Sequence, residues 1–297
     1  MTYDNRTAER RRLQIKTTIA GVLLAAVCIA IIGLGIHREF DARSAEIRSA
    51  EIEAGNLARS LLQHAEDSIE LVDTALIGIA HRLETEGFGS EAVSRLQNFL
   101  YFRKATLPRL RGLFVYAADG SWVATSETNN IVGHNNSDRT YFQRHRSSPD
   151  RNPFVGPPVR SRSGGQWIIT VSRRVDAPDG NFAGVVLATM DVDYFVRGFS
   201  LFNVGTEGSL SLLTPEGTML ARYPFDDQIV GRNFSASPVM RHVIDASSGV
   251  VHFKSVLDGV ERISAFHRSQ RLPLVMLIAR GKQDVLTNWW ADARSRM

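Results

Sequence analysis

The residues best suited to hold a small molecule lie in the stretch 137–195. Near its start, Arg139 is followed closely by two aromatic residues, Tyr141 and Phe142. An arginine offers a planar fork for bidentate contact with a carboxylate, and aromatic rings beside it supply apolar walls. We therefore expect Arg139, Tyr141 and Phe142 to contact an anionic ligand.

The same side chains also have a purely structural interpretation. Arg139 could instead form a salt bridge with a nearby carboxylate, Asp138 or Asp150. The two aromatic rings could belong to a core, as could Trp167 further along the chain. Both interpretations stay open at the level of sequence.

Two expected strands follow, at 166–175 and 181–191, each preceded by a glycine-containing pair typical of a tight hairpin turn. Because side chains alternate along a strand, Thr189 and Asp191 should share one face of the sheet. A cavity between the preceding helix and this sheet would be lined by apolar groups and a few polar ones, as small-ligand pockets are. Thr189, Asp191 and Trp167 are therefore further candidates for ligand binding.

No pattern for catalysis or cofactor binding occurs in the sequence. It has no Gly-x-Ser-x-Gly elbow, phosphate-binding loop, His-Glu-x-x-His motif or dinucleotide fingerprint. The eight histidines are scattered and show no metal-binding spacing. We predict no catalytic residue, no metal and no cofactor. The alternative is a membrane-anchored hydrolase whose Ser, His and Asp come together only on folding.

Composition and charge exclude some classes of protein. The 297 residues are 43% hydrophobic, which is enough for one large or two small cores. The net charge of +4 comes from scattered basic residues, so it does not indicate nucleic-acid binding. A single cysteine, Cys28, excludes an intrachain disulfide.

An apolar run from Thr17 to Ile36 carries no charged residue and is long enough to cross a hydrocarbon core of about 30 Å as a helix. It predicts one transmembrane helix. A cleaved signal peptide is disfavoured because its apolar region is shorter. Basic residues precede the run, so residues 1–16 are expected in the cytoplasm and 37–297 outside, in the periplasm of a Gram-negative cell.

Residues 37–110 predict two stalk helices. From Phe40 to Leu83 no proline occurs, and apolar residues recur at steps of three and four. Two glycines then break the helix, and Ser90 is expected to cap the second one. The apolar stripe favours either packing on the protein's own domain or a parallel homodimer interface. Since it is not a strict heptad, both stay open.

The rest of the chain predicts two α+β domains of the same order. Residues 111–195 contain two strands joined by Asp119-Gly120, a helix capped by Ser137 or Asp138, and three antiparallel strands. The same order recurs in 196–281.

The final segment, 282–297, predicts an exit helix that contains Trp289 and Trp290. Tryptophan is enriched at membrane interfaces, so this pair either marks the return of the chain to the bilayer or packs on the second domain.

This organisation resembles the double Cache (dCache) module, the PAS-like extracytoplasmic sensor domain of bacterial chemoreceptors, sensor histidine kinases and diguanylate cyclases. The likeness covers roughly residues 40–290. The motifs that carry it are Asp138-Arg139-x-Tyr141-Phe142, Gly156-Pro157-Pro158, Trp167-Ile-Ile-x-x-Ser172-Arg173-Arg174, Gly184-Val185-Val186 and Asp193-Tyr194-Phe195.

The resemblance implies a fold and a division of labour. The implied fold is α+β, with an N-terminal transmembrane helix and a long stalk helix followed by two tandem PAS-like antiparallel-sheet domains. Residues 111–195 would be the membrane-distal, ligand-binding domain. Residues 196–281 would be the membrane-proximal domain, which relays the signal through the exit helix.

The resemblance also bears on the ligand. In amino-acid-binding members, an Arg-x-aromatic-aromatic motif holds the ligand carboxylate and a downstream aspartate holds its ammonium group. Arg139 to Phe142 match the first element. Thr189 stands where the aspartate is expected, and His134 stands where a tyrosine is usual. The resemblance therefore favours an anionic ligand without an ammonium group, such as a carboxylate.

We accordingly expect the extracytoplasmic sensor portion of a membrane receptor that binds a small anionic metabolite. Its partners would be this ligand, the membrane and a second copy of the chain joined through the stalk helix, with no nucleic acid. The alternative is a ligand-free periplasmic module for interaction or dimerisation.

Overall fold

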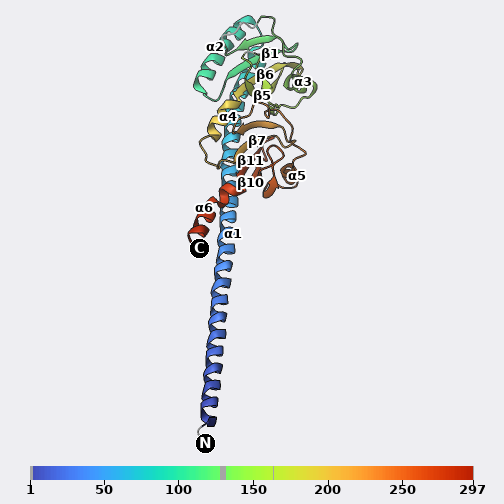
Figure 1. Cartoon of the computed structure of the whole chain (residues 1–297). Coiled ribbons are helices and arrows are strands. Elements are labelled where there is room, and N and C mark those ends of the chain that lie inside the picture. The colour runs from blue at the N-terminus through green and yellow to red at the C-terminus, as the bar shows by residue number, and fades with distance from the viewer. Residues whose placement is uncertain (1–2, 128–131, 163, 297) are drawn as a thin grey trace. The chain divides into compact units, whose positions relative to one another are not determined.

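The computed structural model describes residues 3–296 apart from 128–131 and 163, and leaves out the side chains of 3–22, 25, 288, 292–293 and 295–296. The chain divides into two compact units. One comprises residues 1–50 and 285–297, and the other comprises residues 51–284. Both sheets of the fold lie in the second unit (Figure 1).

A single helix, α1, runs from Tyr3 to Glu86. The predicted span 17–36 is helical, but the side chains of 17–22 and 25 lie outside the described residues. Over the described residues, no helix meets the length and hydropathy needed for a membrane span. The helix ends where the sequence predicts, because Gly87 takes a positive φ of 75°.

The second helix, α2 (Ser90–Thr106), begins one residue earlier than expected. Its N-cap is Gly89, in an extended conformation with no side-chain cap, so the prediction that Ser90 is the cap is wrong.

The first sheet has the strand order β2-β1-β6-β5-β3, with β4 also paired to β5. All its pairings are antiparallel. Its strands are β1 (Gly112–Ala117), β2 (Trp122–Thr125), β3 (Phe154–Val155), β4 (Val159–Arg160), β5 (Trp167–Asp176) and β6 (Phe182–Asp191). Helix α3 (Thr140–Ser147) lies between β2 and β3 in the chain.

The second sheet repeats this arrangement with the order β8-β7-β11-β10-β9. Its elements are β7 (Ser209–Leu213), β8 (Met219–Tyr223), α5 (Pro238–Asp245), β9 (Ser248–Lys254), β10 (Glu261–Arg268) and β11 (Val275–Gly281). Helix α6 (Lys282–Arg296) follows β11 directly. The predicted α+β order of two antiparallel sheets is therefore confirmed.

Three details of the first sheet domain differ from the expectation. Strand β3 and helix α4 (Val192–Phe199) were not predicted. Neither Ser137 nor Asp138 caps α3, whose N-cap residue is Arg139. The carboxylate of Asp138 is used elsewhere, since it accepts a hydrogen bond from Arg162 Nη2 at 2.7 Å.

Each sheet domain contains a turn with the same hydrogen bond at the equivalent position. Asn135 Nδ2 donates to the carbonyl oxygen of Asp119 at 3.0 Å, and Asn233 Nδ2 donates to that of Glu216 at 2.9 Å. Gly120, which follows Asp119, has a φ of 86° that other residues rarely adopt. The second domain is thus a structural repeat of the first.

Each sheet lies between two helical layers. In the first domain, α3 covers one face and α1 with α2 covers the other. In the second domain, α5 covers one face and α1 covers the other. Figure 1 shows the two sheets one after the other along the sheet-bearing part of α1.

The apolar stripe of α1 within residues 51–86 is buried against both sheets. Ala58, Ile69 and Leu76, for example, are fully buried in the core that also contains Val171 and Leu212. Of the two interpretations left open by the sequence, the structure shows packing on the protein's own domains for this segment.

Ion pairs hold the same part of α1 against both sheet domains. Asp73 accepts two hydrogen bonds from Arg173 of β5, at 2.5 and 2.8 Å. Glu66 accepts one from Arg271 of the second domain at 2.9 Å. These contacts fix the register of the helix along the two sheets.

Candidate functional site

A cavity with about 340 Å³ of empty space lies between α3 and the first sheet. Side chains of the loop before α3 and of β4 contribute to its lining. Its lining consists of Phe114, Tyr116, Trp122, Asn136, Arg139, Tyr141, Val159, Arg160, Ser161, Arg162, Ile168, Thr170, Leu187 and Thr189. An adjoining hollow shares Arg139 and Tyr141 with the cavity and widens it toward Gly156.

Arg139 is the N-cap residue of α3 and lines both hollows. The two aspartates considered as salt-bridge partners of Arg139 pair with other arginines: Asp138 pairs with Arg162, and Asp150 lies 3.8 Å from Arg144. Within the described part of the chain, no hydrogen bond or ion pair engages the Arg139 guanidinium. This group is available to a bound anion.

Two phenol groups and one amide form a polar cluster in the cavity wall. Asn136 Nδ2 donates to Tyr141 OH at 2.7 Å and to Tyr116 OH at 3.1 Å. Burial raises the pKa of both tyrosines, so both carry their protons at neutral pH. The Tyr116 hydroxyl donates its hydrogen to the Tyr141 hydroxyl, so Tyr141 is the one of the pair that can donate a hydrogen bond to a ligand oxygen.

Trp122 of β2 supplies another donor. Its Nε1 atom is buried and has no acceptor among the described residues. An unmet buried donor costs free energy, which a ligand acceptor would recover. Trp122 was not among the residues singled out in the sequence, because a tryptophan on a short strand is usually core.

The cavity lining is positively charged. It contains Arg139, Arg160 and Arg162, and no aspartate or glutamate is among its described residues. Arg162 is held by Asn136 Oδ1 at 2.8 Å as well as by Asp138, whereas Arg160 points its charge toward the second domain. The carboxylate of Asp138 lines the adjoining hollow, but it is paired with Arg162. The charges of the lining therefore favour an anion.

Arg160 and Trp167 meet a residue of the second sheet domain. Arg160 Nη2 donates to both carboxylate oxygens of Asp227, at 2.7 and 2.5 Å. Trp167 Nε1 donates to Asp227 Oδ1 at 2.9 Å, and the Arg160 guanidinium lies 4.3 Å from the centre of the indole ring. The wall of the cavity is thus connected directly to the second domain.

The structure brings three of the predicted ligand-binding residues to the cavity: Arg139, Tyr141 and Thr189. Phe142 lies on the other side of α3, fully buried against Phe182. Trp167 lies at the contact with Asp227 rather than in the lining.

The other two predicted residues lie near the cavity without lining it. The ring of His134 packs at 5.0 Å from that of Trp122, behind the wall. Asp191 faces Arg111 at 3.6 Å, and partial burial raises the pKa of its carboxyl group. Its position at the end of β6 therefore gives it a partner outside the cavity.

Residues of the lining that sequence reasoning missed come from distant segments. They include Trp122, Asn136, Arg160 and Thr170. Thr170 is on the same strand face as Ile168, so alternation along β5 was the one signal available for it.

A serine and a histidine do approach each other in this domain. His145 of α3 lies with Nε2 2.9 Å from Ser172 Oγ. Both are buried and neither lines the cavity. Among the described residues no carboxylate bonds to His145, so this pair lacks the third member of a hydrolytic triad.

Comparisons with known proteins agree with this architecture. The family model for the sensor domain of histidine kinases, described as dCache_1-like, matches residues 192–279. The search of curated proteins gives no match.

Solved structures match over most of the chain. The extracellular domain of rpHK1S-Z16, which is assigned as a histidine kinase, is 31% identical, with a TM-score of 0.73, covering 82% of this chain and 98% of that one. The ligand-binding domain of the Pseudomonas fluorescens chemoreceptor CtaA, solved with L-isoleucine, is 16% identical, with a TM-score of 0.64 and coverage of 84% and 99%.

The periplasmic sensory domain of the Campylobacter jejuni chemoreceptor Tlp1 is 12% identical, with a TM-score of 0.68 and coverage of 81% and 98%. The two chemoreceptors share the fold with this chain.

Proposed function

The chain belongs to the double Cache family of extracellular sensor domains of membrane receptors, and we propose that it senses a small anionic metabolite in the cavity of its first sheet domain. In this proposal Arg139 binds a carboxylate of the ligand. Tyr141, Trp122 and Thr189 line the ligand. Phe142, His134 and Asp191 support the wall from behind.

The proposal rests on one observation, the guanidinium of Arg139 in the cavity lining, which is unpaired among the described residues. This guanidinium lines the cavity and, in the described residues, has neither a carboxylate nor a carbonyl partner. A charged group in such a place is stabilised by a counter-ion that offers two oxygens. A carboxylate supplies both.

The charge of the lining bears on the class of ligand. CtaA was solved with L-isoleucine, so a protein of similar fold binds an amino acid. In this chain the described lining of the cavity has no carboxylate, and Asp138 of the adjoining hollow is paired with Arg162. A carboxylate without an amino group is therefore the ligand class that we propose.

Two matched compounds and two matched variants test this proposal. L-Isoleucine and 3-methylpentanoate share a carbon skeleton and differ only in the amino group. We expect the full chain to bind 3-methylpentanoate, or a related carboxylate from a metabolite library, more tightly than its amino counterpart. Arg139→Ala should abolish this binding, and Arg146→Ala, on the exposed side of the same helix, should not.

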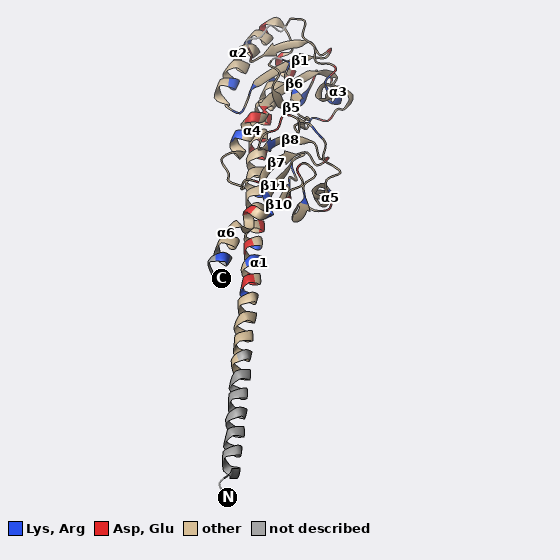
Figure 2. Cartoon of the chain, in the orientation of Figure 1, with Lys and Arg blue, Asp and Glu red and all other residues tan. Residues whose placement is uncertain are grey.

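We further propose the membrane topology expected from the sequence. Residues 17–36 would be a single membrane anchor, with 1–16 cytoplasmic and 37–297 periplasmic. In support, the sequence has no charged residue from Thr17 to Ile36, and Figure 2 shows an uncharged stretch of α1 next to its grey segment. The large apolar side chains described there, such as Leu24 and Ile29, are exposed. Protease protection in spheroplasts tests this topology.

Within this topology, 111–195 would be the membrane-distal domain and 196–281 the membrane-proximal one. Ligand binding would shift the first domain between two states, and the shift would pass to the second domain and on toward α6. The contact of Asp227 with Arg160 and Trp167 supports such a route, since Arg160 also lines the cavity. The ligand can shift the equilibrium only by its difference in affinity for the two states.

A homodimer through the stalk is also proposed. The apolar stripe of α1 is buried within the chain, so a second copy would have to use apolar residues that stay exposed on this helix, such as Ile52, Leu71 and Ile77. Sedimentation equilibrium of the wild type and of Leu71→Glu tests the interface.

A further inference from the structure

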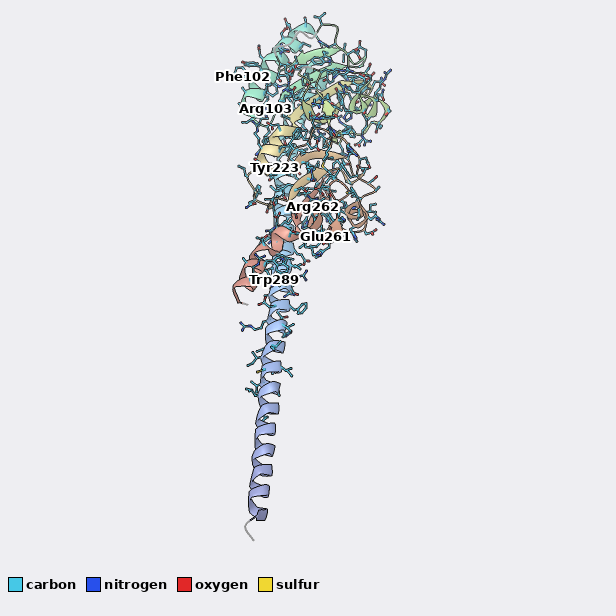
Figure 3. All side chains as sticks on the ribbon, viewed as in Figure 1. Phe102, Arg103, Tyr223, Glu261, Arg262 and Trp289 are labelled. Carbon is cyan, nitrogen blue, oxygen red and sulfur yellow. The ribbon has the colours of Figure 1, made fainter. Side chains whose placement is uncertain are left out.

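The second sheet domain contains a cavity of its own. It lies between α5 and the sheet and has about 530 Å³ of empty space. Its lining consists of Ser209, Ser211, Leu213, Met219, Arg222, Phe234, Ser237, Val239, Met240, Phe253, Ser255, Val256, Leu257, Arg262, Leu277 and Ala279. Figure 3 labels Arg262 in this part of the molecule.

This cavity occupies the same place in the repeat as the first one. Both are bounded by the first two strands, the short helix and the last two strands of their domains. The spacing that relates Asn135 to Asn233 also relates Arg139 to Ser237, and these are the N-cap residues of α3 and α5. The arginine of the first site is therefore replaced by a serine at the equivalent position.

A different arginine brings positive charge to the second cavity. Arg222, on β8, lines it and is mostly buried, and Nη1 makes one long hydrogen bond of 3.3 Å to Ser211 Oγ. No carboxylate of the described chain lies within ion-pair distance of Arg222. Burial, and then the nearby charge of Arg262, lower the pKa of Arg222, while the more distant carboxylates of Asp258 and Asp226 act in the opposite direction.

The second arginine of the cavity is already neutralised. Arg262 donates from Nη1 and Nη2 to the two carboxylate oxygens of Asp258, both at 2.7 Å, and from Nε to the carbonyl oxygen of Glu207. Its nitrogens are therefore occupied. Arg222 is therefore the arginine of this cavity whose positive charge a bound anion would neutralise.

The cavity is polar at one end and apolar at the other. Ser209 and Ser211 lie on β7 on the same face as Leu213, and Ser211 is the cross-strand neighbour of Arg222. Met240, Phe253 and Leu277 supply apolar surface of the α5-facing core. A ligand that fits has one anionic head and an apolar tail.

We propose that the second sheet domain binds a small monocarboxylate with an apolar tail, with its carboxylate at Arg222 and Ser211 and its tail between Met240, Phe253 and Leu277. This is a second site, separate from the one around Arg139 and independent of it. A receptor with both sites would respond to two ligands, because each domain of the repeat has its own cavity.

Binding at this site can be followed in the full chain by the NMR signals of two methionine methyl groups. Met219 and Met240 line the second cavity, whereas Met190 lies in the core of the first domain and lines neither cavity. With carbon-13 in the methionine methyl groups, titration with hexanoate should shift the Met219 and Met240 resonances saturably and leave Met190 unchanged. Hexanamide, which has the same tail without the charge, should bind at least tenfold more weakly.

Substitutions test whether Arg222 binds the carboxylate of hexanoate. Arg222→Gln should raise the dissociation constant for hexanoate at least tenfold, and Arg241→Gln, on the exposed side of α5, should leave it unchanged. Arg139→Ala should also leave it unchanged, which separates this site from the first one. The comparison of hexanoate with hexanamide needs no variant, so the test stands even if Arg222→Gln fails to fold. Unshifted Met219 and Met240 resonances, or equal affinities for hexanoate and hexanamide, would overturn the proposal.

Discussion

Arg160 in the wall of the first cavity and Asp227 in the second sheet domain form an ion pair in which one nitrogen, Nη2, lies 2.7 and 2.5 Å from the two carboxylate oxygens. Both side chains are about half exposed, at 48% and 56%. An exposed pair of this kind contributes at most about 1 kcal/mol, because solvent screens it and two long side chains lose freedom. The pair is thus weak enough to exchange partners when a ligand arrives.

The first prediction concerns this exchange. Asp227→Asn should release Arg160 from its partner and add its charge to the cavity. We expect the affinity for an anionic ligand to rise several-fold, while the free energy of unfolding changes by no more than about 1 kcal/mol. Calorimetric titration and urea unfolding measure the two quantities. Asp226→Asn, at the neighbouring exposed position, is the control, and an equal effect of both variants would count against the exchange.

The second prediction concerns the attachment of the stalk. Asp73 and Arg173 are mostly buried, with side-chain exposures of 14% and 17%, and are joined by two hydrogen bonds. Asp73→Ala leaves a guanidinium without its partner and should lower the free energy of unfolding by about 3 kcal/mol. Asp67→Ala removes an exposed carboxylate from the same helix and should cost less than about 0.5 kcal/mol. Similar urea midpoints for the two variants would contradict the assignment.

The third prediction concerns pH. Burial lowers the pKa of His145 to about 4, against 6.5 for an exposed histidine. Between these values the unfolded chain binds a proton that the folded chain does not, so stability is retained above pH 6.5 and lost as the pH falls toward 4. The loss from this residue is roughly 3 kcal/mol in total.

The variant His145→Gln should flatten this dependence. It should not abolish it, because burial also lowers the pKa of His267. Urea unfolding between pH 4 and pH 7 gives the slope, with His242→Gln, exposed on α5, as the control. An unchanged slope in His145→Gln would show that this histidine is charged in the folded chain.

The fourth prediction concerns the unmet donor of Trp122. Trp122→Phe keeps an aromatic ring in the wall and removes the Nε1 hydrogen. If a ligand oxygen accepts this hydrogen, the affinity should fall about tenfold, and the stability should be retained because the donor has no partner in the free protein. Trp290→Phe, at an exposed position, should bind normally. Full affinity in Trp122→Phe would remove this donor from the site.

Much of the fold could be predicted from the sequence because local signals agreed. The turn at Asp119-Gly120 and the alternation in β5 and β6 place these strands correctly. Helix α4 was not predicted, although its buried residues follow a helical spacing. They are Val192, Phe195, Val196 and Phe199.

The candidate site could be predicted only in part, because its walls come from segments far apart in the chain. Arg139 and Tyr141 both lie at the start of α3, which the sequence predicts as a helix. Trp167 instead donates a hydrogen bond to Asp227, 60 residues away in the chain. No local sequence pattern indicates this partner. The same holds for the stripe of α1, whose burial against two sheets depends on tertiary packing.

The central claim is that Arg139 binds the ligand carboxylate in the first cavity. The most direct measurement is calorimetric titration of the full chain and of Arg139→Ala with 3-methylpentanoate and L-isoleucine, or with the best pair of matched compounds from a library. We predict tighter binding of the compound without the amino group, and a loss of at least tenfold in Arg139→Ala but not in Arg146→Ala. Undiminished binding in Arg139→Ala, or a preference for the amino acid, would contradict the account.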